Sequence, residues 1–260
     1  MRKFFAISLI AALIPVSALA QTPDQHKNIA TNWTGFYAGL NTGGTFGSSN
    51  AQTSTIYEEG GYFASPDVQI VNSTGNMNLH PKGYAGGLQF GYNWQIAKWV
   101  LGAEADYGVL AVSRTSLGVG QYTETDGDQP FTISQTVSTD WMSSVRARVG
   151  HTYHKHALIF GSAGAAETVV RYSSTFTDTY ESLFETATPK VLKTGWIAGG
   201  GTEYAMNKRW SARAEYLFAD FGKVSNVDLT GASWDDVANP FTHAATLKSN
   251  IGRIAINYRF

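Results

Sequence analysis

The chain has 260 residues, a formal net charge of -1, no cysteine, and only 15% charged residues. The near-zero charge excludes electrostatic attraction to nucleic acid, and the lack of cysteine excludes disulfides, thiol catalysis and thiolate metal sites. Ordinary soluble domains contain about 25% charged residues. Few charges, together with 27 glycines and 13% aromatic residues, favour a sheet that contacts an environment less polar than water.

The first twenty residues have the pattern of a secretory signal peptide. Arg2 and Lys3 precede an apolar run, and small residues end at Ala20, so the expected cleavage is before Gln21. The apolar run is shorter than the about 20 residues that a transmembrane helix needs, and we find no later run of that length. We expect a signal peptide over 1–20, a short N-terminal segment over 21–32 and one domain over 33–260.

Apolar and polar residues alternate with a period of two along the remaining chain, without a sustained helical period. The expected strands are 34–44, 84–94, 99–107, 141–150, 157–166, 194–204, 210–218 and 249–260. In the second strand Phe90 and Trp94 share the apolar face, and Gln89 lies on the opposite face. In 157–166 both faces are small or apolar, and we expect Leu158 and Phe160 on the outer face.

The connections between these strands alternate strictly between short and long. Short turns are expected at 95–98, 153–155 and 205–209, and long polar connections at 46–82, 109–139, 168–192 and 222–245. Short periplasmic turns and long extracellular loops are typical of outer-membrane barrels. The sequence therefore predicts an all-β fold: an eight-stranded antiparallel up-and-down transmembrane β-barrel with four long extracellular loops and a periplasmic segment over 21–32.

Alternation alone leaves the outer face undetermined, because a soluble barrel of lipocalin type has the same period with its apolar face inside. The tryptophans favour the membrane orientation. Trp94, Trp99 and Trp210 lie at the short-turn ends of strands, and Trp141 and Trp196 at the long-loop ends, all on the apolar face. Two aromatic girdles around an aliphatic band suit the two interfaces of a bilayer.

The last strand carries Tyr258 and Phe260 on its apolar face and must close the barrel against the first strand. A C-terminal aromatic residue on such a strand is typical of the assembly signal that the outer-membrane insertion machinery recognises. This ending predicts a Gram-negative outer membrane as the location.

Four acidic and four basic residues are expected to point into the barrel. They are Glu104, Asp106, Glu203, Glu215, Arg146, Arg148, Arg213 and Arg253. Unpaired charges are costly in a narrow lumen, so we expect an ion-pair network that plugs the barrel. The alternative is a gated polar channel in which the pairs rearrange. Glu104 and Asp106 could suggest the paired carboxylates of a glycosidase. They lie two residues apart on one strand, among inward arginines and without a substrate cleft, so we expect no enzyme activity.

Histidines supply the remaining candidates. His151, His154 and His156 have the density of metal ligands but straddle a short turn, where a polar interfacial role is expected and periplasmic metal binding is the alternative. His80 and His243 lie near aromatic residues in the long connections, and an axial histidine beside an apolar slot suits haemin. We expect ordinary loop packing there, with haemin binding as the alternative, and no resident cofactor or metal.

The stretches "WTGFYAGLNTGG", "VLGAEADYG", "VRARVG", "GWIAGGGTEYAMNKRWSARAEYLFADFGK" and "INYRF" resemble the small eight-stranded outer-membrane β-barrel family of alphaproteobacteria. The likeness extends over nearly the whole chain from Trp33 and is weakest in the long connections. The family includes surface antigens, haemin-binding members and proteins called porins. The resemblance implies the fold and not an activity.

We therefore expect a structural, surface-exposed protein of the cell envelope. A loop-mediated binder of haemin or a host surface component and a narrow, weakly conducting pore are the alternatives. The expected partners are outer-membrane lipid, lipopolysaccharide and the barrel-assembly machinery. Acidic stretches such as "TETDGDQP" and "SWDDV" predict an anionic surface that would disfavour lipopolysaccharide without divalent cations.

Overall fold

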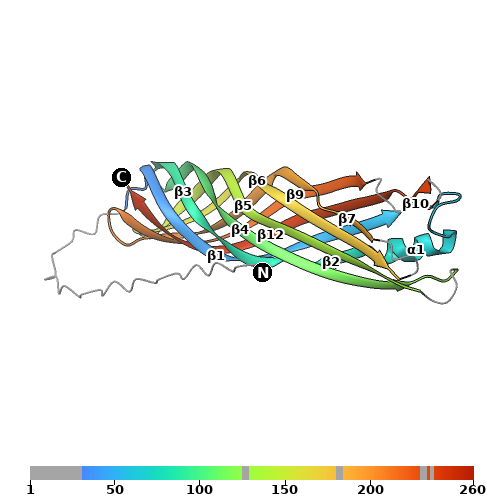
Figure 1. The fold of residues 1–260 in the computed structure, drawn as a ribbon. Helices are drawn as coiled ribbons and strands as arrows, with labels where there is room; N and C mark the ends of the chain where they lie inside the picture. The colour runs from blue at the N-terminus through green and yellow to red at the C-terminus, as the bar shows by residue number, and fades with distance from the viewer. Residues whose placement is uncertain (1–30, 125–128, 180–183, 229–232, 235–236) are drawn as a thin grey trace, which may run out of the picture.

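The computed structural model describes residues 31–124, 129–179, 184–228, 233–234 and 237–260. The expected signal peptide and most of the segment 21–32 lie outside these residues. The elements are β1 (Gly35–Thr55), α1 (Ser65–Thr74), β2 (Asn76–Leu79), β3 (Lys82–Ile96), β4 (Trp99–Gln121), β5 (Pro130–Tyr153), β6 (Ala157–Asp178), β7 (Phe184–Ala187), β8 (Lys190–Ala205), β9 (Trp210–Asp228), β10 (Ser233–Trp234), β11 (Val237–Ala238) and β12 (Phe241–Arg259). They form an elongated barrel, with α1 at the end far from the C-terminus (Figure 1).

Eight strands form the closed ring, in the order β1, β3, β4, β5, β6, β8, β9 and β12, with every neighbour antiparallel. The last strand pairs with the first from Tyr37 opposite Arg259 to Thr55 opposite Phe241. The three short turns are where the sequence predicted them, and Ala97 and His154 adopt positive φ angles in two of them. The eight-stranded antiparallel barrel is therefore confirmed.

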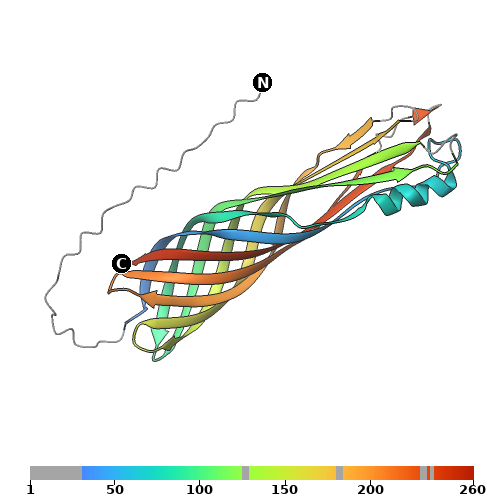
Figure 2. The ribbon, with the colours of Figure 1, turned by 90° about the horizontal axis from the view of Figure 1, so that it is seen from below.

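The register of the ring fixes the strand tilt, which Figure 2 shows from a second side. A path straight across neighbouring strands passes through Lys82, Phe46, Asn250, Phe218, Ala198, Ala163, Ala147, Ala103 and Tyr92. It returns to β3 ten positions from its start. This offset in eight strands corresponds to a tilt of about 40° and to an interior that side chains fill.

The predicted bounds of the four long connections are wrong, because the strands continue into each of them. β1 extends to Thr55, and β5 begins at Pro130. The alternation persists there in a weaker form: Ile133 and Val137 of β5 are buried, whereas the intervening Ser134 and Thr136 lie on the outer face. Serine and threonine on the outer face resemble a polar loop in composition, although β-branched threonine favours strands.

At the far end the closed ring opens into two facing sheets. β3 begins at Lys82 opposite Ser113, so the described part of β4 beyond Ser113 pairs only with β5. The pairing of β8 with β9 likewise ends at Trp196 opposite Asp220. One sheet contains β2, β1, β12 and β9, and the other contains the upper parts of β4, β5, β6 and β8 with β7. We call this pair of sheets the two-sheet body.

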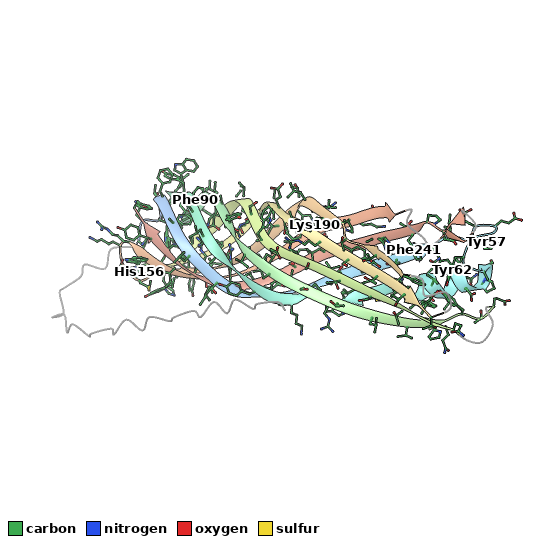
Figure 3. The ribbon with its side chains drawn as sticks, in the orientation of Figure 1. Tyr57, Tyr62, Phe90, His156, Lys190 and Phe241 are labelled. Atoms are coloured by element: carbon green, nitrogen blue, oxygen red, sulfur yellow. The ribbon has the colours of Figure 1, made fainter. Side chains whose placement is uncertain are left out.

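Aromatic rings form the core of the two-sheet body. Phe63, Tyr122, Phe131, Phe176 and Phe241 are almost completely buried, and their ring centroids lie 5.0–6.2 Å apart. Figure 3 labels Phe241 and Tyr62 at this end, near α1. The helix adds Val68 and Val71 to the same core. No helix in the described part of the chain is both long and apolar enough to span a membrane.

The placement of Leu158 and Phe160 on the outer face is wrong. Both are buried inside the barrel, and the intervening Ile159 is 52% exposed. Leu158 packs with Trp33 and Val100 at the short-turn end. The strand therefore carries apolar side chains on both faces near this end, which is why its parity was uninformative.

We predict that Phe176→Ala lowers the free energy of opening the two-sheet body by about 3–5 kcal/mol, because the substitution leaves a cavity among stacked rings. Hydrogen exchange measured by mass spectrometry should become faster over 130–138 and 171–178 and remain unchanged over 141–153. Ser173→Ala, on the outer face of the same strand, is the matched control. Equal exchange in the two variants would contradict a core that holds the sheets together.

Candidate functional site

The barrel brings together all eight charged side chains that the sequence placed inside it. β4 supplies Glu104 and Asp106, β5 supplies two arginines, and β8, β9 and β12 supply the others. Each of the eight residues is between 1% and 7% exposed. Alternation along each strand puts them on the inner face, and the strand register sets them at neighbouring heights.

Arg146 and Arg213 connect the network. The guanidinium of Arg146 donates to Glu104 Oε1 at 2.6 Å, to Asp106 Oδ2 at 2.8 Å and to Glu215 Oε2 at 3.3 Å. Arg213 donates to the second oxygen of Glu104 and, at 3.1 Å, to Glu203 Oε2. Because each arginine bridges several carboxylates, the eight side chains form one connected network.

The other two arginines connect its ends. Arg148 donates to Glu203 Oε2 at 3.0 Å. Arg253 donates to Glu215 Oε1 at 2.7 Å and to Asp106 Oδ2 at 3.3 Å. Four carboxylates thus face four guanidinium groups, and the charges cancel within this network. A balanced and hydrogen-bonded set is the arrangement in which buried charges are tolerated.

Neutral side chains complete the network, and sequence reasoning did not single them out. Tyr37 donates a hydrogen bond to Glu104, Asn257 donates to Glu203 Oε1 at 3.0 Å, and Ser144 donates to Asp106 Oδ2 at 2.8 Å. The ring of Phe160 lies 4.1 Å from the Arg148 guanidinium carbon, a cation–π contact. For Tyr37 a signal existed, since it has the same parity as the inward Gly39 and Asn41.

Little space remains beside these groups. The cavity lined by Asn41, Asp106 and Arg253 has a volume of about 10 Å³, which is room for a single water molecule. Glycines make the close packing of the strands possible: an added Cβ on Gly43 would lie 2.8 Å from the Cβ of Arg253. The charged interior is therefore a filled layer.

A second layer lies at the short-turn end, where Trp33 fills the mouth of the barrel. Its side chain is 1% exposed and packs against Val100, Leu158 and Ala205. The Arg259 guanidinium lies 4.8 Å from the centroid of the Trp33 ring. The backbone N–H of Trp33 donates to Gln95 Oε1 at 2.8 Å, which holds the segment against the first turn.

The aromatic core of the two-sheet body is the third layer. At its outer edge Tyr122 donates to Asp178 Oδ2 at 2.9 Å, and Tyr62 donates to the same oxygen. Burial, and next the nearby Asp178 carboxylate, raise the pKa of Tyr122 above the ordinary value of a phenol. The hydroxyl therefore remains protonated and acts as a donor.

The two histidines considered for haemin do not share a pocket. His243 is fully buried inside the two-sheet body, where its Nδ1 lies 3.1 Å from Thr53 Oγ1 and its ring stacks on Phe241. His80 is exposed, between β2 and β3. Tyr180, another aromatic residue of the long connections, lies outside the described residues, and so does the side chain of Trp234.

The three histidines of the short turn also point to separate partners. His151 packs against the ring of Trp99, His154 against Tyr153, and His156 Nδ1 lies 3.0 Å from Thr31 Oγ1. Within the ranges that the structure describes, no three potential ligands are grouped to hold a metal ion.

The outer surface carries the aromatic residues expected there. Trp94, Trp99, Trp196 and Trp210 are 43–59% exposed, and Trp141 is partly exposed. Phe90 extends outward from β3 between the two rows (Figure 3). Phe260 is 81% exposed at the short-turn end, with its ring 5.2 Å from that of Tyr258.

Comparisons with known proteins agree with this architecture. The sequence model of the outer membrane protein beta-barrel domain matches residues 6–260. The 31 kDa outer-membrane immunogenic proteins of Brucella melitensis and Brucella suis are each 30% identical to this chain over 257 residues, which cover 98% of this chain and 95% of the relative.

Solved structures with a similar course of the chain include two outer-membrane proteins. OprG from Pseudomonas aeruginosa is 12% identical, with a TM-score of 0.42, over 89% of this chain and 99% of its own. Neisserial surface protein A is 12% identical, with a TM-score of 0.37, over 87% of this chain and 98% of its own. On the evidence of the domain match and the Brucella relatives, the chain belongs to the outer-membrane β-barrel protein family and is a protein of the outer membrane.

Proposed function

We propose that the protein is a sealed, non-conducting barrel that anchors the two-sheet body at the cell surface and has a structural role in the envelope. The observation that carries this proposal is the filling of the lumen at three separate heights. Trp33 fills the short-turn end, the ion-pair network fills the middle, and aromatic rings fill the far end. Solute would have to displace all three layers to cross.

The outer surface supports insertion in a bilayer. Tyr84 and Trp94 mark the two aromatic rows on β3, ten positions apart. Ten residues span about 33 Å along a strand, which at a tilt of about 40° is roughly 25 Å of height. An outer-membrane barrel has an apolar band of about this height between its aromatic girdles. The short turns would then be periplasmic and the two-sheet body extracellular.

The remaining roles follow from this placement. Lipid and lipopolysaccharide would surround the band, and the barrel-assembly machinery would recognise Phe260 and Tyr258 during insertion. The interior carboxylates accept hydrogen bonds from arginines, so we propose a protein without catalytic chemistry. The Brucella relatives are named immunogenic, and surface display of the two-sheet body would make this chain accessible in the same way.

The alternatives have weaker support. Haemin binding would need His243 to leave a packed core, and His80 faces away from it. A pore would need the ion pairs to separate, and the cavity beside Asp106 and Arg253 has room for only one water.

We predict that the purified protein in planar lipid bilayers gives no unit conductance above that of protein-free lipid. The physical reason is the absence of a continuous aqueous path through three filled layers. The contradicting result is reproducible single-channel steps from the folded protein that are lost when it is unfolded. The Trp33→Ala variant would show the same steps.

We predict that Glu104→Gln destabilises the barrel by about 3–5 kcal/mol, because Arg146 and Arg213 each lose a buried anionic partner. Urea unfolding in detergent micelles, followed by tryptophan fluorescence, measures the change. Glu167→Gln is the matched control, since Glu167 is partly exposed on the outer face of β6 and accepts one hydrogen bond, from Thr194. Equal stability of the two variants would show that the network does not hold the barrel together.

A further inference from the structure

Cations gather at one height on the barrel, just above the upper aromatic row. Four of them form what we call the lysine arc: Lys82 on β3, Lys248 on β12, Lys223 on β9 and Lys193 on β8. These strands and β1 are consecutive neighbours in the ring. The arc therefore covers a continuous part of the circumference.

The strand register establishes the common height. The path across the ring that starts at Lys82 passes two positions below Lys248, five below Lys223 and five below Lys193. Each step along that path also descends by about 1.25 residues because of the tilt. After this correction the four positions lie within about two residues of one another, or roughly 5 Å of height.

Aromatic residues lie directly below the arc on the same strands. Tyr84 is two positions below Lys82, Trp196 is three below Lys193, and Phe218 is five below Lys223. Rings at this level mark the lipid–water interface, so the ammonium groups would lie at the height of the lipid headgroups.

Three of the four side chains of the arc are exposed on the outer surface. Lys82, Lys223 and Lys248 are exposed. Lys223 faces outward because Gly222, with φ of +69°, interrupts the alternation of β9 after the buried Phe221. A residue with a side chain is disfavoured at that angle. Lys193 lies on the same face of β8 as the buried Ile197 and is partly exposed. Its Nζ extends into the opening between β8 and β9 and donates to the carbonyl oxygen of Lys223 at 2.8 Å.

Most of the positive charge in the arc is unopposed. Lys248 lies 3.4 Å from Asp220 Oδ2. Lys82, Lys193 and Lys223 form no ion pair with any side chain that the structure describes. On the strands that follow β8 in the ring, Arg171 of β6 is paired with Asp140 of β5, and Glu167 of β6 lies opposite Thr194, next to Lys193. The positive potential at this height is therefore concentrated on one side of the barrel.

We propose that the lysine arc binds the phosphate groups of the phosphorylated glycolipid in the outer leaflet, the lipid A part of lipopolysaccharide. Lysine is a strong point charge for phosphate, and a glycolipid brings its phosphates to the headgroup level. The inference rests on the lipid-facing orientation proposed above. The expectation of an anionic surface rested on acidic stretches whose aspartates, at 126, 128, 235 and 236, lie outside the described residues; the described lysines give this level a positive charge.

The test is a titration of the folded protein in maltoside micelles with bisphosphorylated lipid A, followed by native mass spectrometry. The variant Lys82→Gln/Lys193→Gln/Lys223→Gln/Lys248→Gln should bind at least about tenfold more weakly than the unchanged chain, since each interfacial lysine contributes several-fold. The unchanged chain should bind dephosphorylated lipid A at least about tenfold more weakly than bisphosphorylated lipid A. Inorganic phosphate at equal concentration should not compete with lipid A.

The matched control is Lys98→Gln/Lys155→Gln/Lys208→Gln, which removes lysines at the short-turn end and should leave binding unchanged. Heat-modifiable gel migration checks that each variant is folded, and Lys82→Gln/Lys223→Gln replaces the fourfold variant if that one does not fold. Undiminished binding by folded arc variants, equal loss in the control, or displacement by inorganic phosphate would overturn the proposal. Conductance through the barrel would contradict the proposed sealed lumen. It would not affect this titration, which measures binding to the outer surface.

Discussion

An eight-stranded barrel has an interior that only its own side chains can occupy, and every charge placed there must find its partner there. Arg146, with Glu104, Asp106 and Glu215 around it, shows how this chain meets that constraint. The network connects residues from five strands, so it also specifies their relative heights. The same filling that stabilises the lumen removes the space that a channel or a catalytic cleft would need.

The two ends of the barrel meet different demands. At the short-turn end the side chain of Trp33 fills the mouth of the barrel, and β12 pairs with β1. At the far end the wall divides into two sheets, and aromatic rings replace charges as the filling. Hydroxyl groups on the outer face there bond across strands, as Thr115 does with Thr136 at 2.8 Å. In the proposed orientation this body faces water and continues from the lipid-facing band, and the lysine arc lies at the boundary between them.

Alternation and the short turns were enough to predict the eight strands and the inward charges, because a narrow barrel imposes period two on every strand. The extensions were missed since Ser134 and Thr136 resemble loop residues, although buried Ile133 and Val137 keep the alternation. The prediction that Phe160 faces outward was wrong because its ring packs against Arg148, which belongs to another strand. Alternation within one strand gives no information about such a contact. The lysine arc depends on strand register and tilt, so no reading of a single strand could reveal it.

The most direct test of the account is the direction in which the apolar face points. The chain has no cysteine, so single cysteines at Ala103, Ala147 and Ala214 can carry spin labels in lipid bilayers. The account predicts high collision rates with oxygen and low rates with an aqueous nickel complex at these sites, and the reverse at Ser173 on the two-sheet body. Ready access of the nickel complex to the three alanine sites would contradict it.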